Sequence, residues 1–332
     1  MNNALTPSIS VILPTRDRPV LLAGCLACLQ ANDYPQREII IVDQSQDDET
    51  ATVVRHAAAL DDSLRYVRSG AVGSSRAQNI ALALARGEVV AMTNDDCLPA
   101  TDWLERIAAE FTADPEVVAV FGPFLPLGLS PRTVPVAALT GRRRWTPRSP
   151  HQVWRLGYGG NMAFRLEAVL AVGGWDEMLG PGSPRGWGCN DVDLIYRVLR
   201  RGGRAVYDPS IIVWHMQQHN LRQALRREAA YARGAGAIVA KLLRCGDRSG
   251  WHLLAQRLWP LGAGRNWQEL LESLDGGRWW TTTVRALYRM CCLVALIPLG
   301  LYAGWRQPLQ DHERTLYQNS LTSPAVCGPR SA

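Results

Sequence analysis

Asn94, Asp95 and Asp96 close the apolar segment VVAM that begins at Val89. A short, β-branched run followed by turn formers is typical of a buried parallel strand that ends in a loop. Open α/β sheets bind ligands at the carboxyl ends of their strands. Paired carboxylates there could hold a divalent cation, and the cation could hold a diphosphate. An acidic turn before the helix expected near Thr101 is the alternative interpretation.

A further carboxylate, Asp191, begins an amphipathic segment from Asn190 to Arg200, after a glycine-rich loop. Helix N-termini stabilise negative charge, so we expect Asp191 to be ionised. An ionised carboxylate beside such a loop could be a general base or could only compensate the helix dipole. His215 ends another apolar segment and could complete a metal shell, although a lone His is more often structural.

Polar residues follow other expected strands as well. Thr15 follows the first strand and Asp43 ends the second, so both could face one base or ribose. Gly73 leads into a helix whose amide end favours anions, and Arg76 could reach a phosphate. A turn or capping role is the alternative for Asp43. The dinucleotide fingerprint G-x-G-x-x-G is absent after the first strand, which argues against a dehydrogenase.

Strands that alternate with helices of ten or more residues must position these side chains. Such alternation predicts right-handed βαβ units, a mostly parallel sheet and the α/β class. The expected strands are 8–14, 38–43, 64–67, 88–93, 117–121, 204–207 and 211–215, and the expected helices are 19–31, 47–60, 74–85, 103–111, 166–172 and 190–200.

The bulk properties describe a globular protein with a basic balance. The 332 residues are 20% charged and 47% hydrophobic, with a net charge of +6. This balance favours anionic partners, but no RNP or zinc-knuckle pattern accompanies it, so we do not expect a nucleic acid partner. The N-terminal residues show no basic region before an apolar stretch, so we expect no signal peptide and a cytoplasmic site of action.

The composition changes after residue 218. Residues 219–310 read as helical, basic and rich in tryptophan, which suits a bilayer interface. The uncharged run from Met290 to Trp305 would be about 24 Å long as a helix, short of a roughly 30 Å hydrocarbon core. An interfacial or re-entrant anchor, a membrane span and a buried helix stay open for it. We expect residues 311–332 to form a flexible tail.

Five stretches resemble glycosyltransferase family 2, the inverting nucleotide-sugar transferases with the GT-A fold. In chain order they are ISVILPTRDRP, EIIIVDQSQDDET, GSSRAQNIALALARGEVVAMTNDDCLP, GGNMAFRLEAVLAVGGWDE and GWGCNDVDLIYRVLRRGGRAVYDPSIIVWH. The resemblance implies a GT-A catalytic domain over residues 1–218, with a nucleotide-binding half at 8–121 and an acceptor-binding half at 122–218.

The resemblance implies a role for each candidate residue. Asp191 is expected to be the catalytic base. Nucleotide contacts are expected from Pro14, Thr15, Arg16, Asp43, Arg76, Asn94 and Asp95; acceptor contacts from Gly159, Gly160, Asn161, Trp187 and Asn190; and metal ligation from Asp95, Asp96 and His215. Trp187 could equally be ordinary core filler.

Three positions depart from the family pattern. Asn94 replaces the first Asp of D-x-D, Asn190 replaces the Glu before the base, and Gln44 replaces a second acid after the second strand. We therefore expect weaker binding of Mg²⁺ or Mn²⁺. The Q-x-x-R-W motif of processive members is missing, so we expect transfer of one sugar at a time.

The expected activity is metal-dependent, inverting transfer from a nucleoside-diphosphate sugar to a saccharide or lipid-linked acceptor. We expect it to take place peripherally or anchored at the inner face of the cell membrane. A nucleotidyltransferase and a catalytically inactive nucleotide-sugar-binding relative are the alternatives.

Overall fold

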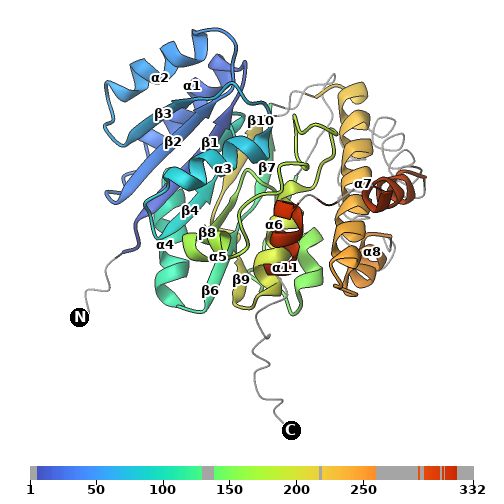
Figure 1. Cartoon of the computed structure of the whole chain (residues 1–332). Helices are drawn as coiled ribbons and strands as arrows, with labels where there is room; N and C mark the ends of the chain where they lie inside the picture. Colours follow the sequence, from blue (N-terminus) through green and yellow to red (C-terminus); the bar gives the residue numbers. More distant parts are fainter. Residues whose placement is uncertain are drawn as a thin grey trace, which may run out of the picture.

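A seven-stranded sheet forms the centre of the computed structural model, which describes residues 6–128, 138–216, 219–258, 291, 295–306, 309 and 311–319 (Figure 1). The strand order is β3-β2-β1-β4-β8-β6-β9. The strands are β1 (Ile9–Thr15), β2 (Arg37–Asp43), β3 (Leu64–Arg68), β4 (Val89–Met92), β6 (Val117–Phe121), β8 (Met162–Arg165) and β9 (Arg204–Tyr207). All pairs are parallel except those of β8 with β4 and β6.

The helices of this part lie close to the ranges expected from the sequence. The described helices of this part are α1 (Pro19–Gln30), α2 (Glu49–Ala58), α3 (Ser74–Leu84), α4 (Trp103–Ala113), α5 (Leu166–Ala171) and α6 (Asn190–Arg200), with a 3₁₀ helix, η1, at Pro150–Arg155. β1 and β4 are buried on both faces, as continuous apolar runs require. The register pairs Thr15 with Asp43 and Ile12 with Met92, so these strands end at one edge.

A second, three-stranded sheet was not foreseen from the sequence. It consists of β5 (Cys97–Pro99), β10 (Val213–Met216) and β7 (Phe124–Leu127), in the order β5-β10-β7. The strand expected at 211–215 belongs to this sheet and covers Val213–Met216. Because β10 pairs antiparallel with β5, His215 lies opposite Cys97, next to Asp96.

The C-terminal part packs onto the same core. α7 (Leu221–Arg244) starts with a capping box between Asn220 and Gln223 and is followed by α8 (Gly250–Leu258). A Cβ atom on Gly234 would lie 2.3 Å from the carbonyl oxygen of Gly188, so α7 touches the loop before α6 backbone to backbone. Figure 1 shows α7 alongside the main body.

One expectation for the C-terminus changes. Residues 311–319 were expected in a flexible tail but form the helix α11 (Asp311–Asn319), because Leu316 and Tyr317 are buried against the core. Residues 295–306 are helical and cross α7 closely at Gly236. Among the helices that the structure describes, none combines the length and apolarity needed to cross a bilayer. Trp259, Trp267, Trp279 and Trp280 lie outside the described residues.

Candidate active site

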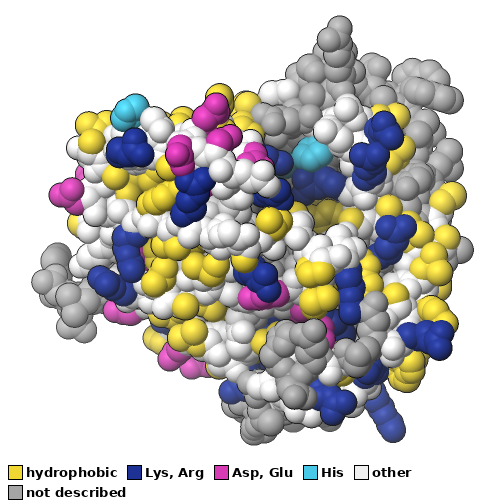
Figure 2. Space-filling view, turned by 45° about the horizontal axis from the view of Figure 1, so that its top comes forward, with side chains coloured by type: hydrophobic (Ala, Val, Ile, Leu, Met, Phe, Trp, Pro, Cys, Tyr) yellow, Lys and Arg dark blue, Asp and Glu magenta, His cyan; other side chains and the backbone are white. Residues whose placement is uncertain are grey.

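A cavity of about 330 Å³ opens where β1 and β4 end. Figure 2 turns this edge toward the viewer and shows Lys and Arg side chains beside a hollow in the surface. Parts of the chain that are remote in sequence form its walls: the loops after β1 and β4, the turn into α3, the start of α6, β10 and one face of α7. Basic groups around a concave site attract anionic ligands.

Asp95 and Asp96 form the acidic wall of this cavity. The Thr15 hydroxyl donates to Asp95 Oδ2 at 2.9 Å, and Nη1 of Arg18 lies 3.2 Å from both Asp95 Oδ1 and Asp96 Oδ2. Burial and the charge of Asp96 raise the pKa of Asp95 to about 6. Burial also opposes ionisation of Asp96, but His215, Arg18 and Arg227 outweigh it and lower the pKa of Asp96 to about 2. Asp96 is therefore charged throughout the physiological pH range, whereas Asp95 takes up a proton below about pH 6.

His215 faces the same carboxylate. Its Nε2 lies 3.6 Å from Asp96 Oδ2, and its ring stacks on Phe124 at a centroid distance of 4.5 Å. No group of three His, Cys, Asp or Glu side chains forms a complete metal cage within the described ranges. The donor set fits a cation that is held jointly with a phosphate ligand.

Asp191 lies on the opposite part of the wall, in the first turn of α6. Its Oδ2 accepts from the Gly159 amide at 3.2 Å and its Oδ1 from the Val192 amide at 2.9 Å. Burial nevertheless raises the pKa of Asp191, against these bonds and the charge of Arg227. From the sequence, the helix terminus alone is expected to keep Asp191 ionised. The structure adds burial, which makes Asp191 a stronger base than an exposed Asp.

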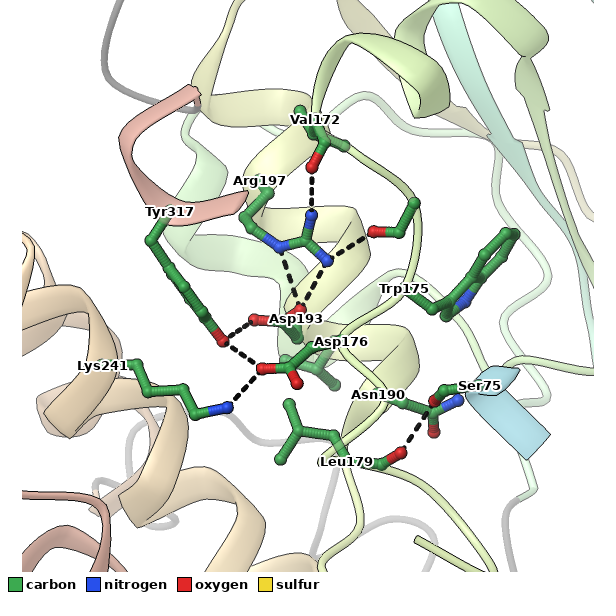
Figure 3. A network of polar contacts seen from close by, with 12 residues as sticks. Ser75, Val172, Trp175, Asp176, Leu179, Asn190, Asp193, Arg197, Lys241 and Tyr317 are labelled. Carbon is green, nitrogen blue, oxygen red and sulfur yellow. Dashed lines mark hydrogen bonds and ion pairs between the residues drawn. The ribbon is translucent and has the colours of Figure 1, made fainter. Parts of the chain in front are cut away.

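A buried ionic network anchors α6 beneath Asp191 (Figure 3). Arg197 binds Asp193 at 2.7 Å and also donates to the carbonyl groups of Val172 and Gly174. The Tyr317 hydroxyl of α11 lies 2.6 Å from Asp193 Oδ1 and 3.2 Å from Asp176 Oδ2. Lys241 of α7 pairs with Asp176 and, at 2.5 Å, with Glu313. Three other chain segments, residues 172–176, α7 and α11, thereby fix the helix that carries Asp191.

The turn into α3 forms the third wall. Gly73 has φ +131°, which favours glycine, and Gln44 holds it from both sides: Nε2 donates to the Gly73 carbonyl at 3.1 Å and Oε1 accepts from the Gly73 amide at 3.2 Å. Ser74 Oγ is buried and has no hydrogen-bond partner among the described residues. Gln44, which departs from the family pattern as an amide in place of an acid, therefore shapes a turn that ends in helix amides.

The cavity brings together most of the candidates expected from the sequence. Its wall includes Pro14, Thr15, Arg16, Asn94, Asp95, Asp96, Gly159, Gly160, Asn190, Asp191 and His215.

Four other candidates do not line the cavity. Asp43 is fully buried and accepts from the Ser45 amide and the Tyr66 hydroxyl. Arg76 pairs with Glu177. Asn161 is buried and satisfies backbone carbonyls from two loops. Trp187 is 6% exposed beneath the guanidinium of Arg185. Their contacts within the protein are compatible with supporting positions, and their expected ligand contacts stay predictions.

Sequence reasoning missed Arg18, Arg227 and Tyr231 on the cavity wall. Arg227 and Tyr231 stand one helical turn apart on α7, beyond the domain boundary expected at residue 218. Arg227 donates to His219 at 3.1 Å, and its charge acts on both Asp96 and Asp191. A usable signal was the helical spacing of Arg227, Tyr231 and Gly234, since a glycine mid-helix often marks a close contact.

The chain is similar in sequence to known glycosyltransferases. Residues 10–169 match the family model described as Glycosyl transferase family 2. A pre-mycofactocin glycosyltransferase of Mycobacterium tuberculosis is 31% identical over 205 residues, 58% of this chain and 41% of that protein. The chain thus spans less than half the length of this relative. A glucosyl-dolichyl phosphate glucuronosyltransferase of Haloferax volcanii is 26% identical over 213 residues, 63% of this chain and 68% of that protein.

Solved structures share the fold over most of the chain. A mannosyltransferase from Pyrobaculum calidifontis, in complex with GDP-Man and Mn²⁺, superposes with a TM-score of 0.56 and 22% identity over 87% of each chain. S. aureus TarS in complex with UDP-GlcNAc gives a TM-score of 0.59 and 17% identity, covering 95% of this chain and 90% of the other.

Proposed function

The chain belongs to glycosyltransferase family 2 and has the GT-A fold, and from this premise we propose that it transfers a single sugar from a nucleoside-diphosphate sugar to an acceptor hydroxyl. The observation that carries the proposal is the meeting of Asp191 with the Asp95–Asp96 pair around one cavity. Asp191 comes from α6 and the Asp95–Asp96 pair from the loop after β4, about a hundred residues earlier in the chain.

In the proposed reaction, Asp191 takes the proton of the acceptor hydroxyl as its oxygen attacks the anomeric carbon. The bond to the diphosphate oxygen breaks, and the diphosphate leaves with the bonding electron pair. The Gly159 and Val192 amides hold the carboxylate in place. A single displacement inverts the anomeric configuration and needs no covalent intermediate. General base catalysis of this kind contributes about 10²- to 10⁴-fold.

The leaving diphosphate needs positive charge and hydrogen-bond donors. The amide end of α3 and the unpartnered Ser74 hydroxyl offer donors on one side of the cavity. Asp96 and His215, assisted by Asp95, would hold Mg²⁺ or Mn²⁺ on the other side. The cation would neutralise charge that develops on the diphosphate. The Mn²⁺ in the Pyrobaculum mannosyltransferase structure supports this assignment.

We expect the donor and the acceptor to bind on different sides of the cavity. We propose that residues 8–121 supply the donor side, and that residues 122–218 supply the acceptor side together with Arg227 and Tyr231 of α7. Gly159 and Gly160 line the acceptor side next to Asp191. The Haloferax relative is named for a dolichyl phosphate-linked sugar, which supports a saccharide or lipid-linked acceptor here.

A lipid-linked acceptor would place the enzyme at the inner face of the membrane. Along helical residues 295–306, one face exposes Leu299, Tyr302 and Trp305 to at least 55% and ends at Arg306. Aromatic and aliphatic side chains next to a basic residue suit the headgroup region of a bilayer. These exposed side chains support a peripheral association.

Substitution of the base tests the proposal. Donor nucleotides are first identified by the rise in melting temperature that they cause with Mn²⁺, and Asp191→Asn is then compared with wild type for release of nucleoside diphosphate and for glycosylated product. We expect the turnover of Asp191→Asn to fall about 10²- to 10⁴-fold while donor binding is kept. Asp102→Asn, an exposed carboxylate that pairs with Arg106 outside the cavity, is the matched control.

Three results would contradict the proposal. Wild-type turnover in Asp191→Asn would exclude the base. Pyrophosphate as the released product would indicate a nucleotidyltransferase. Donor binding without turnover in wild type, across donors and acceptors, would indicate an inactive nucleotide-sugar-binding relative.

A further inference from the structure

Arg18 occupies an unusual place in the acidic wall. It is the N-cap residue of α1, where its side chain makes no capping hydrogen bond. One nitrogen, Nη1, instead contacts Asp95 Oδ1 and Asp96 Oδ2 at 3.2 Å each. The side chain is 47% exposed, whereas the side chains of Asp95 and Asp96 are about nine-tenths buried. A long, half-exposed cation thus rests on two fixed, buried anions.

Arg18 and His215 converge on the same oxygen. His215 Nε2 lies 3.6 Å from Asp96 Oδ2, which is also the atom that Nη1 of Arg18 contacts. A divalent cation held by Asp96 and His215 would approach this oxygen and would be repelled by the guanidinium beside it. Since the carboxylates are buried and Arg18 is not, Arg18 is the group that can move.

We propose that Arg18 is a donor-binding residue that releases the Asp95–Asp96 pair when the cation enters and then pairs with the diphosphate that the cation carries. The inference rests on the proposed function. A guanidinium presents a planar fork that matches phosphate oxygens. Arg18 also lines the cavity that contains Ser74 and the start of α3, so a diphosphate there stays within its reach.

The exchange couples the binding of cation and nucleotide. A cation alone must displace Arg18 without offering it a new partner, so its binding is weak. A cation with a nucleoside diphosphate provides that partner. Coupling of this kind is reciprocal, since each ligand raises the affinity for the other by the same factor, typically about 5- to 150-fold.

Direct cation titration tests this exchange. Free Mn²⁺ is measured by electron paramagnetic resonance on the full chain, with and without GDP or UDP, for wild type and Arg18→Ala. We expect Arg18→Ala to bind Mn²⁺ alone about threefold or more tightly than wild type, because a competing exposed ion pair is removed. The same variant should bind nucleoside diphosphate with Mn²⁺ about tenfold more weakly, because a charged phosphate contact is lost. The two effects have opposite signs, which a general loss of structure cannot produce.

Two variants provide the controls. Arg106→Ala removes an exposed cation that pairs with Asp102 outside the cavity, so its affinity for Mn²⁺ alone should be unchanged. Arg18→Lys keeps the charge and loses the fork; it should bind Mn²⁺ alone as weakly as wild type does and should lose part of the nucleotide affinity.

The outcomes separate this inference from the proposed function. If wild type binds Mn²⁺ with nucleotide but Arg18→Ala leaves the affinity for Mn²⁺ alone unchanged or weaker, the exchange is wrong and the metal site stands. If no variant binds Mn²⁺ with any nucleoside diphosphate, the metal site itself is wrong, and the exchange is overturned with it.

Discussion

Asp95 shows how one residue can serve a site at the expense of stability. Its side chain is buried, and its pKa of about 6 lies above the ordinary value of 3.8. Between these two values the folded protein binds more protons than the unfolded chain, so the contribution of Asp95 to stability falls as pH rises through this window. Above about pH 6 the folded state carries a charge that burial and Asp96 both disfavour. A cation or the Arg18 guanidinium relieves that charge.

Substitution of Asp95 should therefore stabilise the protein while it weakens cation binding. In metal-free buffer at pH 7.5, we expect Asp95→Asn to raise the free energy of unfolding by about 1 to 2 kcal/mol. This gain is smaller than the raised pKa of Asp95 alone implies, because the contact with Arg18 is lost. The gain should vanish below about pH 4, where the carboxyl group is protonated in both states. Urea unfolding at several pH values measures it. An equal gain at every pH, or a loss at pH 7.5, would refute this explanation, and Asp102→Asn controls for simple removal of a charge.

The sequence predicted some site residues and not others, for a physical reason. Thr15, Asp96 and Asp191 follow strand or loop ends that must lie at the carboxyl edge of a parallel sheet, and all three line the cavity. Asp43 and Asn161 have equally suitable residue types at similar places. Whether a polar side chain faces the cavity or satisfies a buried backbone group depends on loop paths, and no local pattern encodes those.

At the scale of elements, α7 is the least expected part of the site. It follows the segment that resembles the family, in the basic and tryptophan-rich part that was expected to suit a bilayer interface. Instead, Gly234 lets it lie against the loop before α6, and Arg227 and Tyr231 reach the cavity from there. The same helix carries Lys241, which is 2% exposed and pairs with Asp176 and Glu313. α7 thus links the acceptor side to α11.

A larger side chain at Gly234 should destabilise the protein. A Cβ atom on Gly234 would lie 2.3 Å from the backbone oxygen of Gly188, so we expect Gly234→Ala to lower the free energy of unfolding by about 1 to 3 kcal/mol, despite the better helix propensity of alanine. Donor turnover should also fall, because Gly188 leads into α6. The matched control is Gly24→Ala in α1, where the nearest atom would lie 3.6 Å away and where we expect a small gain. Chemical denaturation measures the free energy of unfolding of both variants. Similar changes in the two would exclude the tight contact.

At the scale of the whole molecule, the order of strands and helices up to residue 121 could be predicted, because each strand has its own apolar run and each helix its own period. Two features could not. β8 runs antiparallel between β4 and β6, and β5, β7 and β10 form a separate sheet from three distant segments. Such pairings depend on long-range register, and the second one brings His215 to Asp96.

The site is thus assembled from two parts of the chain that are far apart in sequence. The N-terminal half supplies the acids and the turn into α3, and the segments from 158 to 231 supply the base, His215 and the α7 face. The ionic network of Asp176, Asp193, Arg197, Lys241 and Tyr317 holds these later segments together (Figure 3). Unpairing a buried charge of this kind costs roughly 3 to 5 kcal/mol, so the network has few tolerable substitutions.

The central claim is that one cavity holds the donor diphosphate and its cation within reach of Asp191. Crystals grown with Mn²⁺ and the nucleoside diphosphate of highest affinity, measured by anomalous scattering, test it most directly. The account predicts an anomalous peak beside Asp96 and His215, with the diphosphate between it and the start of α3 and with Asp191 across the cavity. A Mn²⁺ peak away from Asp96, or a nucleotide bound outside this cavity, would contradict it.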